Sequence, residues 1–209
     1  MTANMDDQCN IVKLSRKDGA SARRQGILDA ASALIFERGY DPVSIADIGA
    51  AAGVSGPAIY RHFDSKADIL HVLCNQTVDR LIEFVGPRRP GPVEELGALV
   101  AGQVKLVSRY PQLVRVFSDE ERSLPVALGR QVRQRERDHA QRWIDALRQV
   151  HTDMAPASVE TLAYAVVGLI LSAARWPRAL RSNPGFEARL TQAAYRLLDV
   201  PHSATELDG

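Results

Sequence analysis

The chain has 209 residues, of which 45% are hydrophobic and 24% are charged, and its formal net charge is +1. These values describe a globular protein that can bury a core, and they exclude nucleic-acid binding driven by overall charge alone. The two cysteines, Cys9 and Cys74, form neither a metal-ligand spacing nor a disulfide framework, which fits a reducing cytoplasm.

The N-terminal sequence MTANMDDQCN carries acidic residues where a secretory signal carries basic ones. The longest apolar run, residues 163–174, is about half as long as a bilayer-spanning helix. We therefore expect a soluble cytoplasmic protein that makes no membrane contact.

The first elements in chain order are an arm and a helix. Residues 1–20 are polar and lack helical periodicity, so we expect a flexible basic arm there. A helical pattern starts at Ser21 and is expected to stop at Gly39.

Two short helices are predicted next. Ser44 is placed to cap the first, which should end at Gly53, and Ser55 is placed to cap the second, over about 56–62. The small residues Ala50 and Ala51 should let the two helices approach closely.

The remaining elements are also predicted to be helical. The Pro/Gly/Arg-rich segment 85–92 is the clearest interruption, and we expect the domain boundary just before or within it. No stretch alternates with the period of a β-strand, so the chain is predicted to be all-α with about nine helices. The later helices are expected at 65–84, 93–109, 111–120, 125–150, 156–175 and 185–199.

Two short helices joined by AAGVS have the arrangement of a helix-turn-helix, in which Gly53 permits a left-handed turn. The second helix of this motif enters the DNA major groove with its first residues facing the bases. Here those residues are small, so they can approach bases closely but offer few hydrogen bonds. The expected base-facing set is Ser55, Gly56, Pro57 and Ala58.

Polar residues around this motif are suited to backbone phosphates. The alternative is that neither residue contacts DNA: Tyr60 would pack its ring in the protein, and His62 would form its hydrogen bonds within the protein. The expected phosphate-binding set is Ser44, Tyr60, Arg61, His62, Lys66, Arg23 and Arg24.

The segment SIADIGAAAGVSGPAIYRHFDSKADIL, residues 44–70, closely resembles the DNA-binding domain of TetR-family transcriptional repressors. The preceding RRQGILDAASALIFERGY fits too, so the match covers roughly 22–72, and the rest is similar only in helix count and order. The resemblance implies the base-facing set above, with Tyr60, His62 and Lys66 on phosphates. Gly56 departs from the larger residue of many members, which leaves more of the specificity to DNA shape.

A single three-helix DNA-binding unit makes few phosphate contacts. We therefore expect two copies, held about 34–36 Å apart, to bind the two halves of a palindromic operator. The last two long helices offer an apolar surface for this homodimer, as the resemblance also implies, although both could be the core of a monomer. The expected interface set is Val166, Val167, Ile170, Ala174, Leu190, Ala194 and Leu197.

In TetR-like proteins the remaining helices enclose a small-molecule site. Arg175 follows twelve largely apolar residues. Its guanidinium should therefore form an ion pair, extend to solvent along the apolar surface, or bind an anionic ligand. For any single aromatic residue, core packing is the simpler alternative. The candidate lining is Tyr110, Leu113, Phe117, Arg142, Trp143, Leu147, Tyr164, Leu171, Arg175 and Trp176.

The segment RYPQLVRVFSDEERSLP, residues 109–125, followed by an Arg-rich helix, resembles actinobacterial TetR-type regulators of lipid or sterol catabolism. That resemblance is looser and implies an acyl-CoA thioester as effector, with Arg88, Arg89 or the Arg-rich helix on its phosphates. A lipophilic drug or a carboxylate would need only an apolar tunnel and one arginine. For the Arg-rich helix, a solvated, salt-bridged face is the default interpretation.

Functionally, we divide the chain into an arm (1–20), a helix-turn-helix DNA-binding domain (21–66) and a ligand-binding and dimerisation domain (67–209). The predicted function is that of a ligand-responsive transcriptional repressor whose partners are an operator in double-stranded DNA, a small lipophilic effector and a second copy. The five histidines are scattered, so we expect no enzyme, cofactor or metal site. The alternatives are a regulator of a drug-efflux gene and a helical ligand carrier or scaffold that does not bind DNA.

Overall fold

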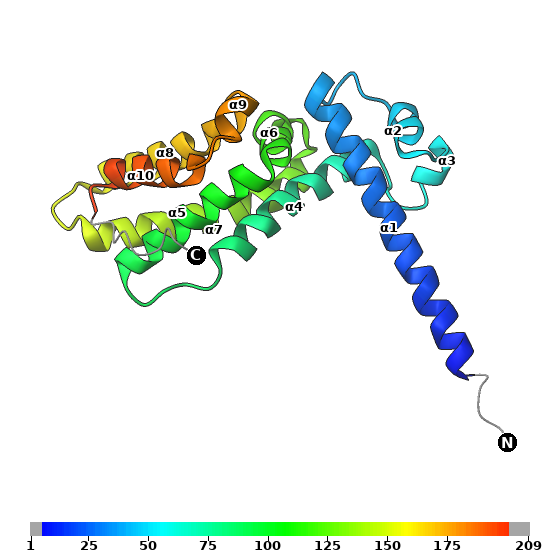
Figure 1. Cartoon of the computed structure of the whole chain (residues 1–209), viewed down its shortest axis with the longest axis horizontal. Coiled ribbons are helices and arrows are strands. Elements are labelled where there is room, and N and C mark those ends of the chain that lie inside the picture. Colours follow the sequence, from blue (N-terminus) through cyan, green and yellow to red (C-terminus); the bar gives the residue numbers. More distant parts are fainter. Residues whose placement is uncertain (1–5, 201–209) are drawn as a thin grey trace. The chain divides into compact units, whose positions relative to one another are not determined.

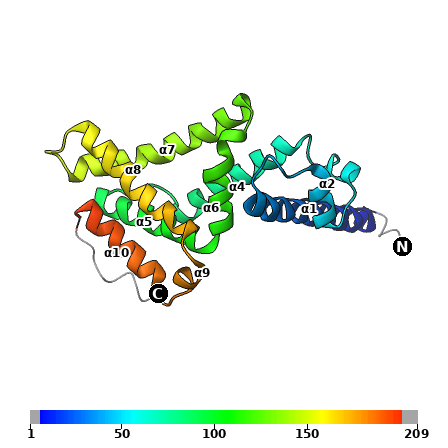
Figure 2. The same cartoon turned by 90° about the horizontal axis from the view of Figure 1, so that it is seen from above.

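The structure, a computed structural model, describes residues 6–200, with side chains from residue 20 onward (Figures 1 and 2). Within this range the regular elements are all helical, which confirms the all-α prediction; the short α9 adds a tenth α-helix to the nine expected. The α-helices are α1 (Asp6–Arg38), α2 (Ile45–Ala52), α3 (Gly56–Ile59), α4 (Lys66–Val85), α5 (Pro92–Arg109), α6 (Pro111–Glu120), α7 (Val126–Val150), α8 (Pro156–Ser172), α9 (Arg178–Arg181) and α10 (Phe186–Leu198), with 3₁₀ turns η1 (Glu121–Ser123) and η2 (Ala173–Arg175).

The chain forms two compact units whose boundary lies between Leu70 and His71, inside α4. We call them the N-terminal unit and the C-terminal unit. The segment 85–92 is not a boundary between units, contrary to expectation, because it connects α4 to α5 within the C-terminal unit.

Helix α1 begins at Asp6, so residues 6–20 are helical where an irregular arm was expected. Residues 6–20 contain no proline and several good helix formers, so the helix predicted from Ser21 can propagate towards the N-terminus. Residues 1–5 of the predicted arm lie outside the described residues.

The core of the N-terminal unit comes from every helix of the unit. Helix α1 supplies a stripe at helical spacing, whereas the short helices α2 and α3 each contribute one isoleucine. This small core fixes the short helices, which would not be stable alone. Its fully buried members are Ile27, Leu28, Ala31, Ile35, Val43, Ile48, Ile59, Phe63, Ile69 and Leu70.

In the C-terminal unit, α5 lies among α7, α8 and α10 (Figure 2). Trp143 of α7 is the largest fully buried side chain. Gly102 marks the closest approach of α5 to the end of α4, because a Cβ there would lie 2.4 Å from Val85 Cγ2. These contacts give α4 and α7 a packed support on α5.

Helix α8 with its 3₁₀ extension spans Pro156–Arg175, and an 18-residue window within it has mean hydropathy 1.7 and is 33% buried inside the chain. By length and composition alone it could cross a membrane, a property it shares with core helices of soluble proteins.

Candidate DNA-reading helices and effector cavity

The start of α2 is fixed by a capping box between Ser44 and Asp47. The Asp47 amide donates to Ser44 Oγ at 3.1 Å, and the Ser44 amide donates to Asp47 Oδ2 at 2.9 Å. The bonds from the Ser44 hydroxyl and amide lower the pKa of the Asp47 carboxyl. Ser44 is exposed, but its hydroxyl already serves the cap.

The turn between α2 and α3 depends on two glycines. Gly53 has φ +67°, a left-handed conformation that other residues rarely adopt. Gly49 is buried against the turn, where a Cβ would lie 2.8 Å from the Val54 carbonyl oxygen. The expectation that Ala50 and Ala51 make this close approach was wrong, since both are exposed.

Helix α3 is a single turn, shorter than the predicted 56–62. Among its first residues, Ser55 and Pro57 are exposed and Gly56 and Ala58 are half-buried. A Cβ on Gly56 would meet nothing within 4 Å, so the first turn of α3 is sterically open. The expected base-facing residues are therefore placed together on an unobstructed helix start.

Several expected phosphate-binding residues have accessible side chains. Tyr60 is 58% exposed, Arg61 and Arg23 are exposed, and His62 is half-buried. Arg24 places its guanidinium 4.6 Å from the centre of the Phe63 ring, so one of its faces is engaged in a cation–π contact.

Lys66 has a different role from the one predicted. Its Nζ donates to the backbone carbonyls of Tyr40, Asp41 and Val43 at 3.0, 3.2 and 2.9 Å, and lies 4.1 Å from the Tyr40 ring centre. An ammonium group has three donors, and all three are used here. Lys66 therefore holds the turn between α1 and α2 and has no donor left for a phosphate.

The C-terminal unit contains a cavity of about 320 Å³ among α4 to α8, which we call the effector cavity. Of the ten predicted lining residues it brings together Phe117, Trp143, Tyr164 and Leu171. The full lining is Thr77, Val78, Leu81, Gln103, Leu106, Val114, Phe117, Arg133, Glu136, Arg137, His139, Ala140, Trp143, Ala163, Tyr164, Val167 and Leu171.

The aromatic and aliphatic residues that do not line the cavity pack elsewhere. Tyr110 stacks on Phe84 with ring centres 6.0 Å apart, and Trp176 meets Phe186 edge to face at 6.1 Å. Leu147 is fully buried in the core of the C-terminal unit. Leu113 is half-buried on α6.

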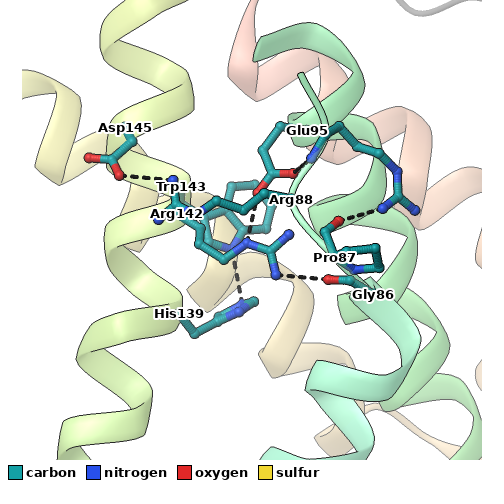
Figure 3. A network of polar contacts seen from close by, with 9 residues as sticks. Gly86, Pro87, Arg88, Glu95, His139, Arg142, Trp143 and Asp145 are labelled. Atoms are coloured by element: carbon teal, nitrogen blue, oxygen red, sulfur yellow. Dashed lines mark hydrogen bonds and ion pairs between the residues drawn. The ribbon is translucent and has the colours of Figure 1, made fainter. Parts of the chain in front are cut away.

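The two predicted arginines of the site are engaged in ion pairs outside the cavity. Arg175 pairs with Asp119. Arg142 donates from Nε to Glu95 Oε1 at 2.7 Å and from Nη1 to the Gly86 carbonyl at 3.0 Å, so it joins α7 to α5 and to the end of α4 (Figure 3). Both residues therefore stabilise the fold around the cavity and do not line it.

Arg88 and Arg89, considered for acyl-CoA phosphates, are also engaged. Arg88 pairs with Asp145 at 3.2 Å (Figure 3). The Arg89 guanidinium donates to the Pro87 carbonyl. The small pocket at this turn is also lined by the carboxylates of Glu95 and Asp145, which already pair with Arg142 and Arg88.

The sequence predicted an Arg-rich helix at α7 but did not identify which of its residues line the cavity. Glu136, His139 and Ala140 lie seven, four and three residues before Trp143, the spacing that places side chains on one face of a helix. That spacing from the predicted Trp143 is the signal that could have identified them.

Most of the predicted dimer-interface residues belong to the core of their own chain, which corrects the prediction. Val167 lines the effector cavity, and only Leu197, at 42%, is exposed. On a helix one residue step is about 100°, so the exposed positions of α8 beside the buried ones are Ala165, Gly168 and Tyr164, and Tyr164 also borders the effector cavity. The buried members are Val166, Ile170, Ala174, Leu190 and Ala194.

Among the described residues, no group of three or more His, Cys, Asp or Glu side chains could hold a metal ion.

A helix-turn-helix unit combined with a helical unit that encloses a cavity defines the class of helix-turn-helix regulators. The family model of bacterial regulatory proteins, tetR family, matches residues 27–73, and that of the tetracyclin repressor-like C-terminal domain matches residues 89–179. The chain belongs to the TetR family, whose members are transcription regulators and not enzymes.

Two curated relatives are HTH-type transcriptional repressors named KstR2. The one from Mycobacterium tuberculosis (strain ATCC 25618 / H37Rv) is 25% identical over 133 residues, covering 62% of this chain and 66% of its own length. The one from Rhodococcus jostii (strain RHA1) is 31% identical over 110 residues, covering 51% and 53%. The chain thus spans just under two thirds, and about half, of these relatives.

A solved structure with the same fold is that of AibR in complex with isovaleryl coenzyme A and operator DNA. Its TM-score is 0.73 at 22% identity, covering 84% of this chain and 98% of that chain.

Proposed function

We propose that this protein is a homodimeric transcriptional repressor that binds a palindromic DNA operator in the cytoplasm and is released by a small lipophilic effector. The observation that carries the proposal is the open first turn of α3, fixed on α2 by the glycine turn and flanked by exposed Tyr60 and Arg61. That geometry suits a recognition helix in the major groove.

The proposed division of labour on DNA follows from side-chain size and charge. Ser55, Pro57 and Ala58 offer one hydroxyl and apolar contacts, for instance to thymine methyl groups. Arg61 and Arg23 provide charge for phosphates, and Tyr60 provides a hydroxyl. Much of the sequence preference would then come from DNA shape.

The homodimer is proposed to use the outer faces of α8 and α10. Helix α8 exposes Tyr164 at 62% together with the small residues Ala165 and Gly168, which allow close helix packing, and α10 exposes Leu197. A two-fold contact between identical faces would present two reading heads to a palindrome.

The effector is proposed to be an acyl-CoA thioester whose acyl end occupies the effector cavity. About 320 Å³ is at the lower end of the range of about 300–1,000 Å³ typical of ligand sites, so the cavity suits a small acyl group and its carbonyl. The relative bound to isovaleryl coenzyme A and operator DNA supports this class.

Helix α4 is the proposed route from effector to DNA. It contributes Thr77, Val78 and Leu81 to the cavity, and it begins at Lys66, which holds the turn before α2. An effector releases DNA only if it binds the non-binding conformation more tightly, by about 1.4 kcal/mol for each tenfold loss of operator affinity.

The test is selection of duplexes from a random-sequence pool, followed by anisotropy titration and sedimentation of the complex. We expect one sequence-selective palindromic site occupied by two chains, with affinity that falls when short acyl-CoA thioesters are added. A chain that binds all duplexes alike, or none, would show that the protein is a ligand carrier or scaffold and not an operator-binding repressor.

A further inference from the structure

Helix α7 contributes four titratable side chains to the effector cavity: Arg133, Glu136, Arg137 and His139. The two arginines already have partners on the protein. Arg133 Nη1 lies 2.8 Å from Glu121 Oε1, and Arg137 Nη2 donates to Gln134 Oε1 at 2.6 Å. These guanidinium groups are therefore held by acceptors of the chain itself.

His139 presents a hydrogen-bond donor to the cavity. Its Nε2 accepts from Trp143 Nε1 at 3.2 Å, so the neutral ring carries its proton on Nδ1 (Figure 3). Burial, followed by the nearby Arg142, lowers the pKa of His139 to about 4, which keeps the ring neutral at pH 7. Within the described residues, nothing accepts from Nδ1.

Glu136 presents an unpaired carboxyl group to the same cavity. It forms no hydrogen bond or ion pair with any residue that the structure describes. Burial raises its pKa, and the neighbouring Glu121 raises it further, against the opposing effect of Arg133 and Arg137. A carboxyl group in this position is stabilised by a ligand that donates a hydrogen bond to it.

We propose that His139 and Glu136 form the polar recognition pair of the effector cavity, and that they select a neutral acyl derivative carrying a carbonyl and an N–H or O–H over the free carboxylic acid. The pair is three residues apart on α7, a spacing that places both side chains on one helix face. The ligand carbonyl would accept from His139 Nδ1, and the ligand N–H or O–H would donate to Glu136.

The same geometry disfavours charged ligands. A carboxylate would lie beside the Glu136 carboxyl group in a mostly apolar cavity, where two like charges repel, and the guanidinium groups of Arg133 and Arg137 already bond to Glu121 and Gln134. An alkylammonium could pair with Glu136 but would lie near two guanidinium groups on the same helix. A neutral acyl derivative that carries both a carbonyl and an N–H or O–H avoids both penalties.

This recognition pair depends on the proposed function in one respect only: the cavity is taken to be the site where the effector binds. Its test is calorimetry of the full chain at pH 7.5, without DNA, using three matched probes. They are the N-acetylcysteamine thioester of isovaleric acid, isovalerate, and isopentylamine. We expect the thioester to bind at least about tenfold more tightly than either charged probe.

Three variants assign the effect to residues. Glu136→Gln should strengthen isovalerate binding by about threefold or more and leave the thioester within a few-fold. His139→Leu should weaken the thioester by about tenfold. Asp138→Asn, an exposed carboxyl on α7 that does not line the cavity, is the matched control and should change none of the three.

Isovalerate binding as tightly as the thioester would overturn the recognition pair, as would absence of binding by all three probes. Tightest binding of isopentylamine, abolished in Glu136→Gln, would reassign the cavity to cations. These results concern ligand chemistry alone, because operator binding is measured separately and its loss would leave them unchanged.

Discussion

Arg142 of α7 lies 2.7 Å from Glu95 of α5, and the two side chains are only 14% and 6% exposed. Glu95 Oε2 also accepts from the Arg89 amide at 2.8 Å, so one carboxylate holds both α7 and the turn that follows α4. Burial alone raises the pKa of Glu95, but the bonds from Arg142 and Arg89 lower it more. The pair thus fastens the cavity wall to the end of α4.

Arg142→Ala should therefore destabilise the C-terminal unit by about 3–5 kcal/mol, because Glu95 would remain buried without its partner. Urea denaturation measures the loss. The matched control is Arg148→Ala, which removes an exposed ion pair to Glu160 and should cost about 0–1 kcal/mol. Equal, small losses in both variants would contradict a structural role for the buried pair.

The depressed pKa of His139 predicts a pH dependence of stability. The unfolded chain protonates this ring near pH 6.5, whereas the folded chain does so near pH 4, so stability is complete above pH 6.5 and is lost as the pH falls towards 4. The shift corresponds to about 3 kcal/mol. The measurement is the loss of unfolding free energy between pH 7.0 and pH 4.5 in the wild type and in His139→Gln. Other titrating groups contribute equally to the two proteins, so the difference between the two losses comes from His139. Parallel losses in the two proteins would rule it out.

Lys66→Met should destabilise the N-terminal unit, because it removes the three bonds to backbone carbonyls and keeps the aliphatic stem. We expect a loss of about 2–3 kcal/mol, measured by denaturation. The salt dependence of DNA binding should stay unchanged in the folded variant, since Nζ has no donor left for a phosphate. A stable variant with a reduced salt slope would restore the phosphate role predicted from the sequence.

Comparing Gly49→Ala with Gly56→Ala distinguishes a glycine required for packing of the turn from one that lies on the proposed DNA-binding surface. Alanine at position 49 would place Cβ 2.8 Å from a backbone oxygen, so we expect a loss of about 1–3 kcal/mol in thermal denaturation. Alanine at position 56 meets open space and should be neutral or slightly stabilising. It would change which operator sequences bind. The opposite ranking in stability would contradict the packing of the turn.

The helices and the reading head were predictable from the sequence because their signals are local. The Ser44 cap and the helix ends at Gly39 and Gly53 depend on residues within one or two turns, and the structure confirms each. Lys66 was misassigned because its partners lie 23 to 26 residues away, and only the folded unit brings them together.

The cavity and the outer helix faces were less predictable for a different reason. Helix α8 is apolar on nearly all sides, so its sequence does not show which face meets the core and which stays outside. Arg142 was expected in the cavity because the sequence does not show its ion-pair partner: Glu95 lies on α5, 47 residues away. Such pairings depend on tertiary packing and leave no local pattern.

The salt dependence of operator binding by wild type and Arg61→Ala, compared with Arg148→Ala, tests most directly that α2 and α3 read DNA. If Arg61 binds a phosphate in each chain of a dimer, its removal should weaken binding to every sequence and reduce the slope of log affinity against log salt by about 1.8. Arg148→Ala should match the wild type. Unchanged affinity and slope in Arg61→Ala would contradict the DNA-binding role of this surface.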